Sequence, residues 1–291
     1  MDELRKIIET QIISNQGRNI FLPDNFRFIK ETIKAISEIH ELNPESEKIL
    51  IDYATEKAFE EFCRINQYFS FNSQARNDLR NIYRNLFSII RTNEKSIETI
   101  SNDHYQNLRL WLQKTNPFSE NTYSNADLNI EPVACAEYRP DLQIKILKLD
   151  IKSIMEPVLD VGCGKNGNFV DYLSKLGIEI FGIDRYLFTQ KNLISSDWLE
   201  YDYGVEKWGT IFSNLGFSNH FRHHNLRVDG EFIEYGKKYM TMLDSLKIGG
   251  KFHYAPDLPF IERFLPESQF KMEKHEICEY GFQTTIITRL K

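Results

Sequence analysis

The sequence predicts an α/β protein in two parts, an all-helical N-terminal domain followed by a doubly wound parallel sheet. Apolar residues recur at helical spacing through residues 1–115. After residue 131, short apolar runs alternate with helical patterns, which is typical of parallel strands joined by crossover helices. The length of 291 residues is sufficient for two domains of ordinary size.

The composition indicates an ordinary globular chain, with 41% hydrophobic and 27% charged residues. With 36 basic and 42 acidic side chains, the net charge is -6, so the basic excess of a protein that coats duplex nucleic acid is missing. Residues 1–6 lead into an amphipathic pattern, and no later stretch holds 18 uninterrupted apolar residues. We therefore expect neither secretion nor a membrane span.

The cysteines predict a cytoplasmic protein with reduced thiols, because they form no C-x-x-C pair. They are Cys63, Cys135, Cys163 and Cys278. Each is expected to be a small buried side chain.

Five helices are predicted in the N-terminal domain from stripes of apolar residues three or four positions apart. They cover residues 4–12, 26–36, 44–63, 79–90 and 97–112. The third is introduced by Asn43 and Pro44, a capping residue followed by a proline in the first turn. We interpret the aromatic residues at helical spacing as core, in preference to the wall of a substrate site.

Residues 116–130 are polar, rich in Asn, Ser and Thr, and weakly periodic. Such a composition is typical of a linker or a lid. The sequence thus predicts a helical cap or accessory domain over residues 1–115, a linker over 116–130 and a second domain over 131–291.

The second domain is predicted to begin with a strand, a turn and a helix. The strand is the apolar run 158–161, the glycine turn covers 162–167, and the helix follows from helical spacing over 169–176. A second strand over 178–183 ends at Asp184. Glycine lets a ligand approach the backbone closely, and a carboxylate one strand over can accept hydrogen bonds from both hydroxyls of a ribose. These features predict a nucleoside-containing ligand.

The glycine pattern has two interpretations. Gly162, Gly164 and Gly167 fit the dinucleotide motif G-x-G-x-x-G, with Asp184 at about the expected distance, so an NAD(P)-dependent oxidoreductase is one alternative. Asp160 argues against it, because a dinucleotide enzyme needs no negative charge facing a pyrophosphate. An acid at this position suits a cationic or amine-bearing ligand.

The run 158–167 resembles the first motif of the class I S-adenosylmethionine-dependent methyltransferases, and Asp184 matches the ribose-binding acid of that family. Further segments similar to the family are 196–198, its third motif; 208–214, its fourth strand; 246–252, its double glycine and fifth strand; and 269–277 with 282–290, its final antiparallel pair. The resemblance covers roughly residues 131–291. It implies a Rossmann-like methyltransferase sheet with S-adenosyl-L-methionine as cofactor.

The resemblance also implies which residues hold the cofactor. They are Asp160, Gly162, Gly164, Gly167, Asp184, Asp197, Trp198 and Tyr138. Asp160 holds the methionine amino group in the family, and Asp197 with Trp198 flanks the adenine; Tyr138 precedes a helix that lies over the cofactor in such folds. Alternatives stay open for three of them: helix packing for Gly167, a helix cap for Asp197 and a core position for Trp198.

On the acceptor side, His220 resembles a histidine found after the fourth strand in small-molecule methyltransferases, where an imidazole can take the proton of the acceptor. The alternative is a histidine at a helix start that bonds to backbone. The segment 214–217 is similar to the Asn/Asp-Pro-Pro-aromatic motif but lacks both prolines. Asn214, Tyr254 and Asp257 are further catalytic candidates at the carboxyl edge of the sheet.

The sequence therefore predicts an S-adenosylmethionine-dependent methyltransferase whose N-terminal domain covers or recognises the acceptor. No metal site is predicted, because His220, His223 and His224 lack partner carboxylates or cysteines. The balanced charge favours a small-molecule acceptor, with nucleic acid or protein left open. A nucleoside-binding module without catalysis is the alternative from a different class, and no oligomeric state is predicted.

Overall fold

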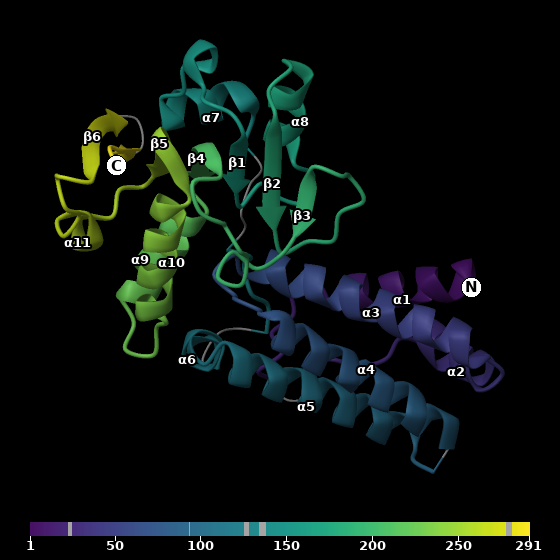
Figure 1. The fold of residues 1–291 in the computed structure, drawn as a ribbon. Coiled ribbons are helices and arrows are strands. Elements are labelled where there is room, and N and C mark those ends of the chain that lie inside the picture. The colour runs from purple at the N-terminus through teal and green to yellow at the C-terminus, as the bar shows by residue number, and fades with distance from the viewer. Residues whose placement is uncertain (23–24, 93, 125–127, 134–137, 278–280) are drawn as a thin grey trace. The chain divides into compact units, whose positions relative to one another are not determined.

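The chain forms two compact units, Met1–Cys135 and Ala136–Lys291 (Figure 1). The structure is a computed structural model, and it describes residues 1–291 apart from 23–24, 93, 125–127, 134–137 and 278–280. In the described part of the chain, no helix is long and apolar enough to cross a membrane.

The first unit is all-helical, as predicted. Its helices are α1 (Asp2–Ser14), α2 (Lys30–His40), α3 (Pro44–Ile65), α4 (Ser73–Thr92), α5 (Ile97–Thr115) and the short α6 (Phe118–Tyr123). The Asn43 side chain accepts a hydrogen bond from the Ser46 amide and caps α3, which is the role that its sequence position predicts.

Helix α2 begins at Lys30, four residues later than the predicted start at Phe26. Residues 25–29 form no helical turn, and some of them hydrogen-bond to other parts of the unit. The amide of Phe28 donates to Ser101 Oγ, and the amide of Ile29 donates to Gln11 Oε1. The rings of Phe26 and Phe28 pack on Tyr105, with centroid distances of 5.1 and 5.9 Å. Tertiary contacts thus replace the helical turn that the apolar spacing predicted.

Residues 116–130, for which the sequence predicts a linker, belong to the helical unit. Asn116 Oδ1 accepts a hydrogen bond from the Ser70 amide at 2.8 Å. Tyr123 is buried, and its hydroxyl accepts from Asn66 Nδ2 at 2.9 Å. The polar side chains that indicated a solvated connection therefore serve as hydrogen-bond partners inside the unit.

The second unit contains one sheet of seven strands in the order β3-β2-β1-β4-β5-β7-β6. The strands are β1 (Val158–Val161), β2 (Ile180–Asp184), β3 (Leu193–Ser195), β4 (Trp208–Asn214), β5 (Leu246–Ala255), β6 (Phe270–Ile277) and β7 (Phe282–Arg289). Strands β1 to β5 run parallel to one another, while β7 is antiparallel to β5 and to β6. The antiparallel pair that the resemblance implied is therefore present at one edge.

Helices cover both faces of this sheet (Figure 1). Residues of α7 (Pro140–Leu147) and α8 (Asn168–Lys175) share a buried cluster with Val158. Residues of α9 (Phe217–Asn225) and α10 (Phe232–Asp244) share a second cluster with Leu159, the next residue of β1. Because successive side chains of a strand point to opposite faces, the sheet is covered on both. The predicted doubly wound, Rossmann-like fold is confirmed. The remaining elements are the short helices η1 (Ile151–Ser153) and α11 (Pro259–Glu262).

Candidate functional site

The carboxyl ends of β1, β2 and β4 meet at one edge of the sheet, and the strand order reverses between β1 and β4. Ligands of open α/β sheets bind at such a switch point. The turns that follow these strands need left-handed backbone, with φ of +87° at Gly162, +79° at Gly164 and +56° at Leu215. Left-handed backbone at a non-glycine residue costs energy, and such residues gather at ligand sites.

Asp160 is a buried carboxylate with 2% of its surface exposed. Among the residues that the structure describes, none donates a hydrogen bond to this side chain. Burial, and after it the charge of Asp184, raises the pKa of Asp160 well above its usual range. A buried charge without a hydrogen-bond donor is costly. A cation or a hydrogen-bond donor that binds to Asp160 would therefore stabilise the folded protein.

Asp184 at the end of β2 connects two turns of the site. Its Oδ2 accepts a hydrogen bond from the Gly164 amide at 2.9 Å, and its Oδ1 accepts from the Arg185 amide at 2.7 Å. A carboxylate oxygen has more than one lone pair and can accept more than one hydrogen bond. The glycine turn after β1 is thereby fixed next to the predicted ribose-binding acid.

Trp198 lies between the turns that follow β1 and β4. A Cβ atom added to Gly162 would lie 3.2 Å from its ring, and one added to Gly216 would lie 3.7 Å from it. The half-buried Trp198 also meets the ring of His220 edge-on, with centroids 4.7 Å apart. It therefore borders both turns and packs against His220 at the same time.

Asp197 stands beside this tryptophan, and its Oδ1 accepts a hydrogen bond from the Leu199 amide at 2.7 Å. Burial raises the pKa of Asp197 to about 6. A donor from a ligand, such as an exocyclic amine, would favour the charged form of this group.

Gly167 caps α8 with a left-handed backbone. A Cβ atom here would lie 2.7 Å from Leu193 Cδ1 on β3. Of the two roles left open by the sequence, this geometry supports close packing of helix on strand.

The Gly167→Ala variant is expected to lower the free energy of unfolding by about 1–3 kcal/mol, because alanine strains the left-handed backbone and overlaps Leu193. Urea-induced unfolding measures this loss. Combined with Leu193→Ala, which removes the overlapping atoms, the loss should be smaller than the sum of the two single losses. Strict additivity would show that the two residues do not press on each other.

The two acceptor-side candidates of the sequence lie at the end of β4 and in the first turn of α9. Asn214 Oδ1 is buried and has no hydrogen-bond partner among the described residues. His220 is 4% exposed, and its Nδ1 lies 3.5 Å from the Tyr235 hydroxyl. The structure thus encloses His220 between Trp198 and Tyr235 and leaves Asn214 with an unused acceptor atom.

Tyr254 and Asp257, the other two catalytic candidates, have partners within the fold. The buried Tyr254 hydroxyl donates to Glu262 Oε1 at 2.7 Å and lies 2.9 Å from the Tyr239 hydroxyl. Asp257 Oδ2 lies 3.2 Å from Lys274 Nζ. These contacts account for both side chains structurally.

Three residues that the sequence analysis singled out have local partners. His224 Nδ1 accepts a hydrogen bond from the Glu231 amide at 3.0 Å, and burial lowers its pKa to about 4. His223 Nε2 lies 3.1 Å from Arg227 Nη1. The carbonyl of Tyr138 accepts from Gln143 Nε2 in the first turn of α7. Within the described residues, no three His, Cys, Asp or Glu side chains form a metal-binding group.

Of the four cysteines, Cys63 and Cys163 are buried and form no disulfide with another described residue. Cys135 and Cys278 lie outside the described residues.

Two residues near the site were missed by the sequence analysis. Ser213 Oγ donates to the Val161 carbonyl at 2.6 Å and accepts from the Phe217 amide at 3.0 Å, so it joins the end of β1 to the start of α9. Tyr235 is fully buried and contacts Trp198, His220 and His224. A serine at a strand end was a usable signal for the first, whereas Tyr235 follows an ordinary helical stripe.

Comparison with models of protein families finds no match, and comparison with curated protein sequences finds none either. The chain is similar to a solved rRNA methylase from Streptococcus thermophilus, at 16% identity over 54% of this chain and 100% of that chain, with a TM-score of 0.34. It is similar to the N-methyltransferase NodS from Bradyrhizobium japonicum, at 12% identity over 52% and 87%, with a TM-score of 0.39. A 1,6-didemethyltoxoflavin-N1-methyltransferase from Burkholderia thailandensis is 14% identical over 52% and 76%, with a TM-score of 0.33. The strand order and the two helix-covered faces of this chain identify its fold independently of these likenesses.

Proposed function

We propose that the C-terminal unit binds S-adenosyl-L-methionine and transfers its methyl group to an acceptor. The observation that carries the proposal is the buried Asp160 carboxylate, to which no described residue donates, next to the left-handed turn of Gly162 and Gly164. An ammonium group supplies both the charge and the donors that this carboxylate lacks. A dinucleotide pyrophosphate would instead bring negative charge towards it.

The residues of the site fit the parts of this cofactor one by one. Asp160 would hold the methionine amino group, Asp184 the ribose hydroxyls, and Asp197 with Trp198 the adenine. When bound, the cofactor supplies a methyl group on a sulfonium, and the sulfur keeps the bonding electron pair when the nucleophile takes the methyl. The main contribution of the protein is to orient two reactants and exclude water.

On the acceptor side, we propose that Asn214 Oδ1 accepts a hydrogen bond from a small-molecule acceptor, since this buried atom has no described partner. A base is required only when the nucleophile starts protonated. In that case His220 is the proposed proton acceptor. Recognition of the acceptor by the helical unit stays a prediction.

The cofactor assignment is tested by isothermal titration calorimetry on the full chain. S-adenosylmethionine and S-adenosylhomocysteine are expected to bind at one site, with no heat from NAD. Binding of NAD without binding of either adenosyl ligand would refute the proposal.

The acceptor class is tested with labelled S-adenosylmethionine and separate metabolite, RNA and protein fractions. Label in the metabolite fraction is the expected result, and label in RNA or protein would replace the small-molecule proposal. Cofactor binding without labelling of any fraction would favour the nucleoside-binding module.

A further inference from the structure

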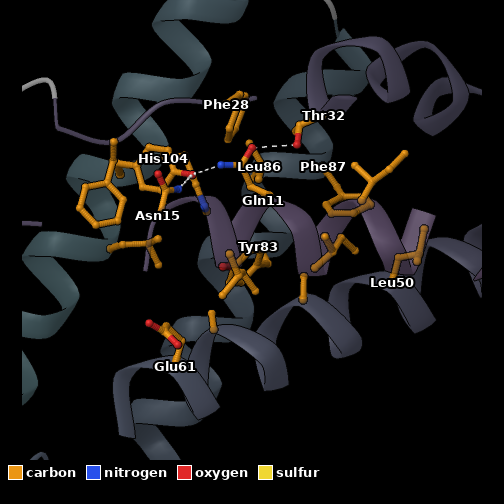
Figure 2. Close-up of a pocket in the computed structure, with 18 of the residues that line it drawn as sticks. Gln11, Asn15, Phe28, Thr32, Leu50, Glu61, Tyr83, Leu86, Phe87 and His104 are labelled. Carbon is orange, nitrogen blue, oxygen red and sulfur yellow. Dashed lines mark hydrogen bonds between the residues drawn. The ribbon is translucent and has the colours of Figure 1, made fainter. Parts of the chain in front are cut away.

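The helical unit contains a cavity of about 140 Å³ lined by residues of helices α1 to α5, and Figure 2 shows many of the side chains that line it. Most of the side chains that line it are apolar and come from all five helices. Examples are Ile8, Ala35, Ala58, Phe87 and Leu108. A dry, hydrocarbon-lined cavity of about 150 Å³ in another protein binds benzene, so this cavity is large enough for one six-membered ring.

One end of the cavity is polar and is formed by the side chains of Gln11, Asn15 and Tyr105, which hydrogen bonds hold in place. Gln11 Nε2 and Asn15 Nδ2 donate to the Tyr105 hydroxyl oxygen at 3.0 and 2.8 Å. Gln11 Oε1 in turn accepts from the Ile29 amide. It also accepts from Thr32 Oγ1 (Figure 2), and the two bonds fix the orientation of the Gln11 amide. The Tyr105 hydroxyl therefore accepts twice, and its proton has no acceptor among the described residues.

His104 lines the cavity next to this end. It is 6% exposed, and its Nδ1 has no hydrogen-bond partner in the described part of the chain. Its ring lies among lining rings, with centroid distances of 6.0 Å to Phe28, 5.1 Å to Tyr83 and 5.2 Å to Tyr105. Burial lowers its pKa to about 4, so the imidazole is neutral at pH 7 and one ring nitrogen is an acceptor.

The lining favours an uncharged ligand. Glu61 lines the cavity, and its charge is balanced by Arg64, which donates to the two carboxylate oxygens at 2.7 and 2.8 Å, while Gln16 donates at 3.0 Å. No other carboxylate, lysine or arginine is among the lining residues. A charged ligand would thus lose its hydration without gaining a partner.

We propose that this cavity is a binding site for an uncharged one-ring hydroxyl compound of the phenol class. The ring fills the apolar part, while the hydroxyl donates to His104 Nδ1 and accepts from the Tyr105 hydroxyl. Both unused hydrogen-bonding groups are satisfied by a single ligand oxygen. The site lies within the helical unit and is independent of the proposed methyl transfer.

The test is a fluorine NMR titration of the full chain with 4-fluorophenol and with fluorobenzene. The phenol is expected to bind about tenfold more tightly, because it gains hydrogen bonds that fluorobenzene cannot make. His104→Phe should weaken phenol binding about tenfold and leave fluorobenzene binding unchanged. The matched control is His40→Phe, the same change at an exposed residue of α2, which should alter neither.

Ala58→Leu locates the site, because the larger side chain occupies the cavity. Binding of both probes should be lost in this variant while its melting temperature stays at or above the wild-type value. Unchanged phenol binding in a folded Ala58→Leu protein would overturn the proposal, as would the absence of phenol binding to the wild type. Equal affinity for the two probes would overturn the roles of His104 and Tyr105. If His104→Phe does not fold, Tyr105→Phe removes the second polar contact and carries the same expected loss.

Discussion

The Asp160→Asn variant is expected to be more stable than the wild type at neutral pH and yet to bind S-adenosylmethionine at least about tenfold more weakly. Asparagine is nearly isosteric with aspartate and removes a buried charge that has no described donor. The free energy of unfolding should rise by about 1–3 kcal/mol, and the melting temperature by several degrees. The same change removes the proposed partner of the ammonium group, so the charge-assisted hydrogen bond is lost. Gain of stability and loss of affinity from one substitution would mark Asp160 as a ligand-binding carboxylate.

The stability difference should depend on pH in one direction. Burial places the folded pKa of Asp160 above the unfolded value, so the folded state holds the proton more tightly. The wild type therefore loses stability as the pH rises through the interval between the unfolded and folded pKa values, and the variant lacks this loss. Melting temperatures of the two proteins should converge at acidic pH and separate as the pH rises. A variant that is less stable at neutral pH would contradict this account.

The Asp184→Ala variant is expected to raise the dissociation constant of S-adenosylhomocysteine about 5-fold to 150-fold. It removes charge-assisted hydrogen bonds to the ribose hydroxyls worth about 1–3 kcal/mol. It also leaves the Gly164 and Arg185 amides without the acceptor that they have in the structure, so the glycine turn is held less firmly. Calorimetric titration of the two proteins measures the change.

A matched control for Asp184 is Asp171→Ala, which removes an exposed acid on α8 that pairs with Lys175 at 2.5 Å. Its affinity for S-adenosylhomocysteine should equal that of the wild type. If Asp184→Ala has the circular dichroism spectrum of the wild type and unchanged affinity, the ribose is bound elsewhere.

The parts of the site that the sequence predicts are those in which chemistry and local backbone coincide. Asp160, the glycine turn and Asp184 lie at the ends of two neighbouring strands, and short apolar runs locate those ends without any knowledge of tertiary contacts. Tyr254 and Asp257 also lie at a strand end, but their partners Glu262 and Lys274 come from separate elements. Local spacing carries no information about such pairings.

In the helical unit too, the sequence predicts the local features but not the tertiary contacts. The apolar stripes predict its long helices, because each stripe is a property of one helix. The hydrogen bonds of Asn116 and Tyr123 depend on the Ser70 backbone amide and the Asn66 side chain, which are far away in the sequence. The cavity depends on which faces of five helices meet, so it was not predictable from spacing. The three-residue strand β3 was missed because it is too short for an alternating pattern.

The two outer strands of the sheet bear on how the protein avoids self-association. An exposed strand edge is a template for pairing with a second molecule, and short or charged edge strands suppress such pairing. One edge is β3, which offers only three residues. The other is β6, whose sequence from Lys271 to Glu276 contains four residues of the Lys and Glu types, with Lys271 and Glu273 3.3 Å apart as an ion pair. Each edge thus carries its own protection against edge-to-edge aggregation, while the apolar parallel strands stay in the interior of the sheet.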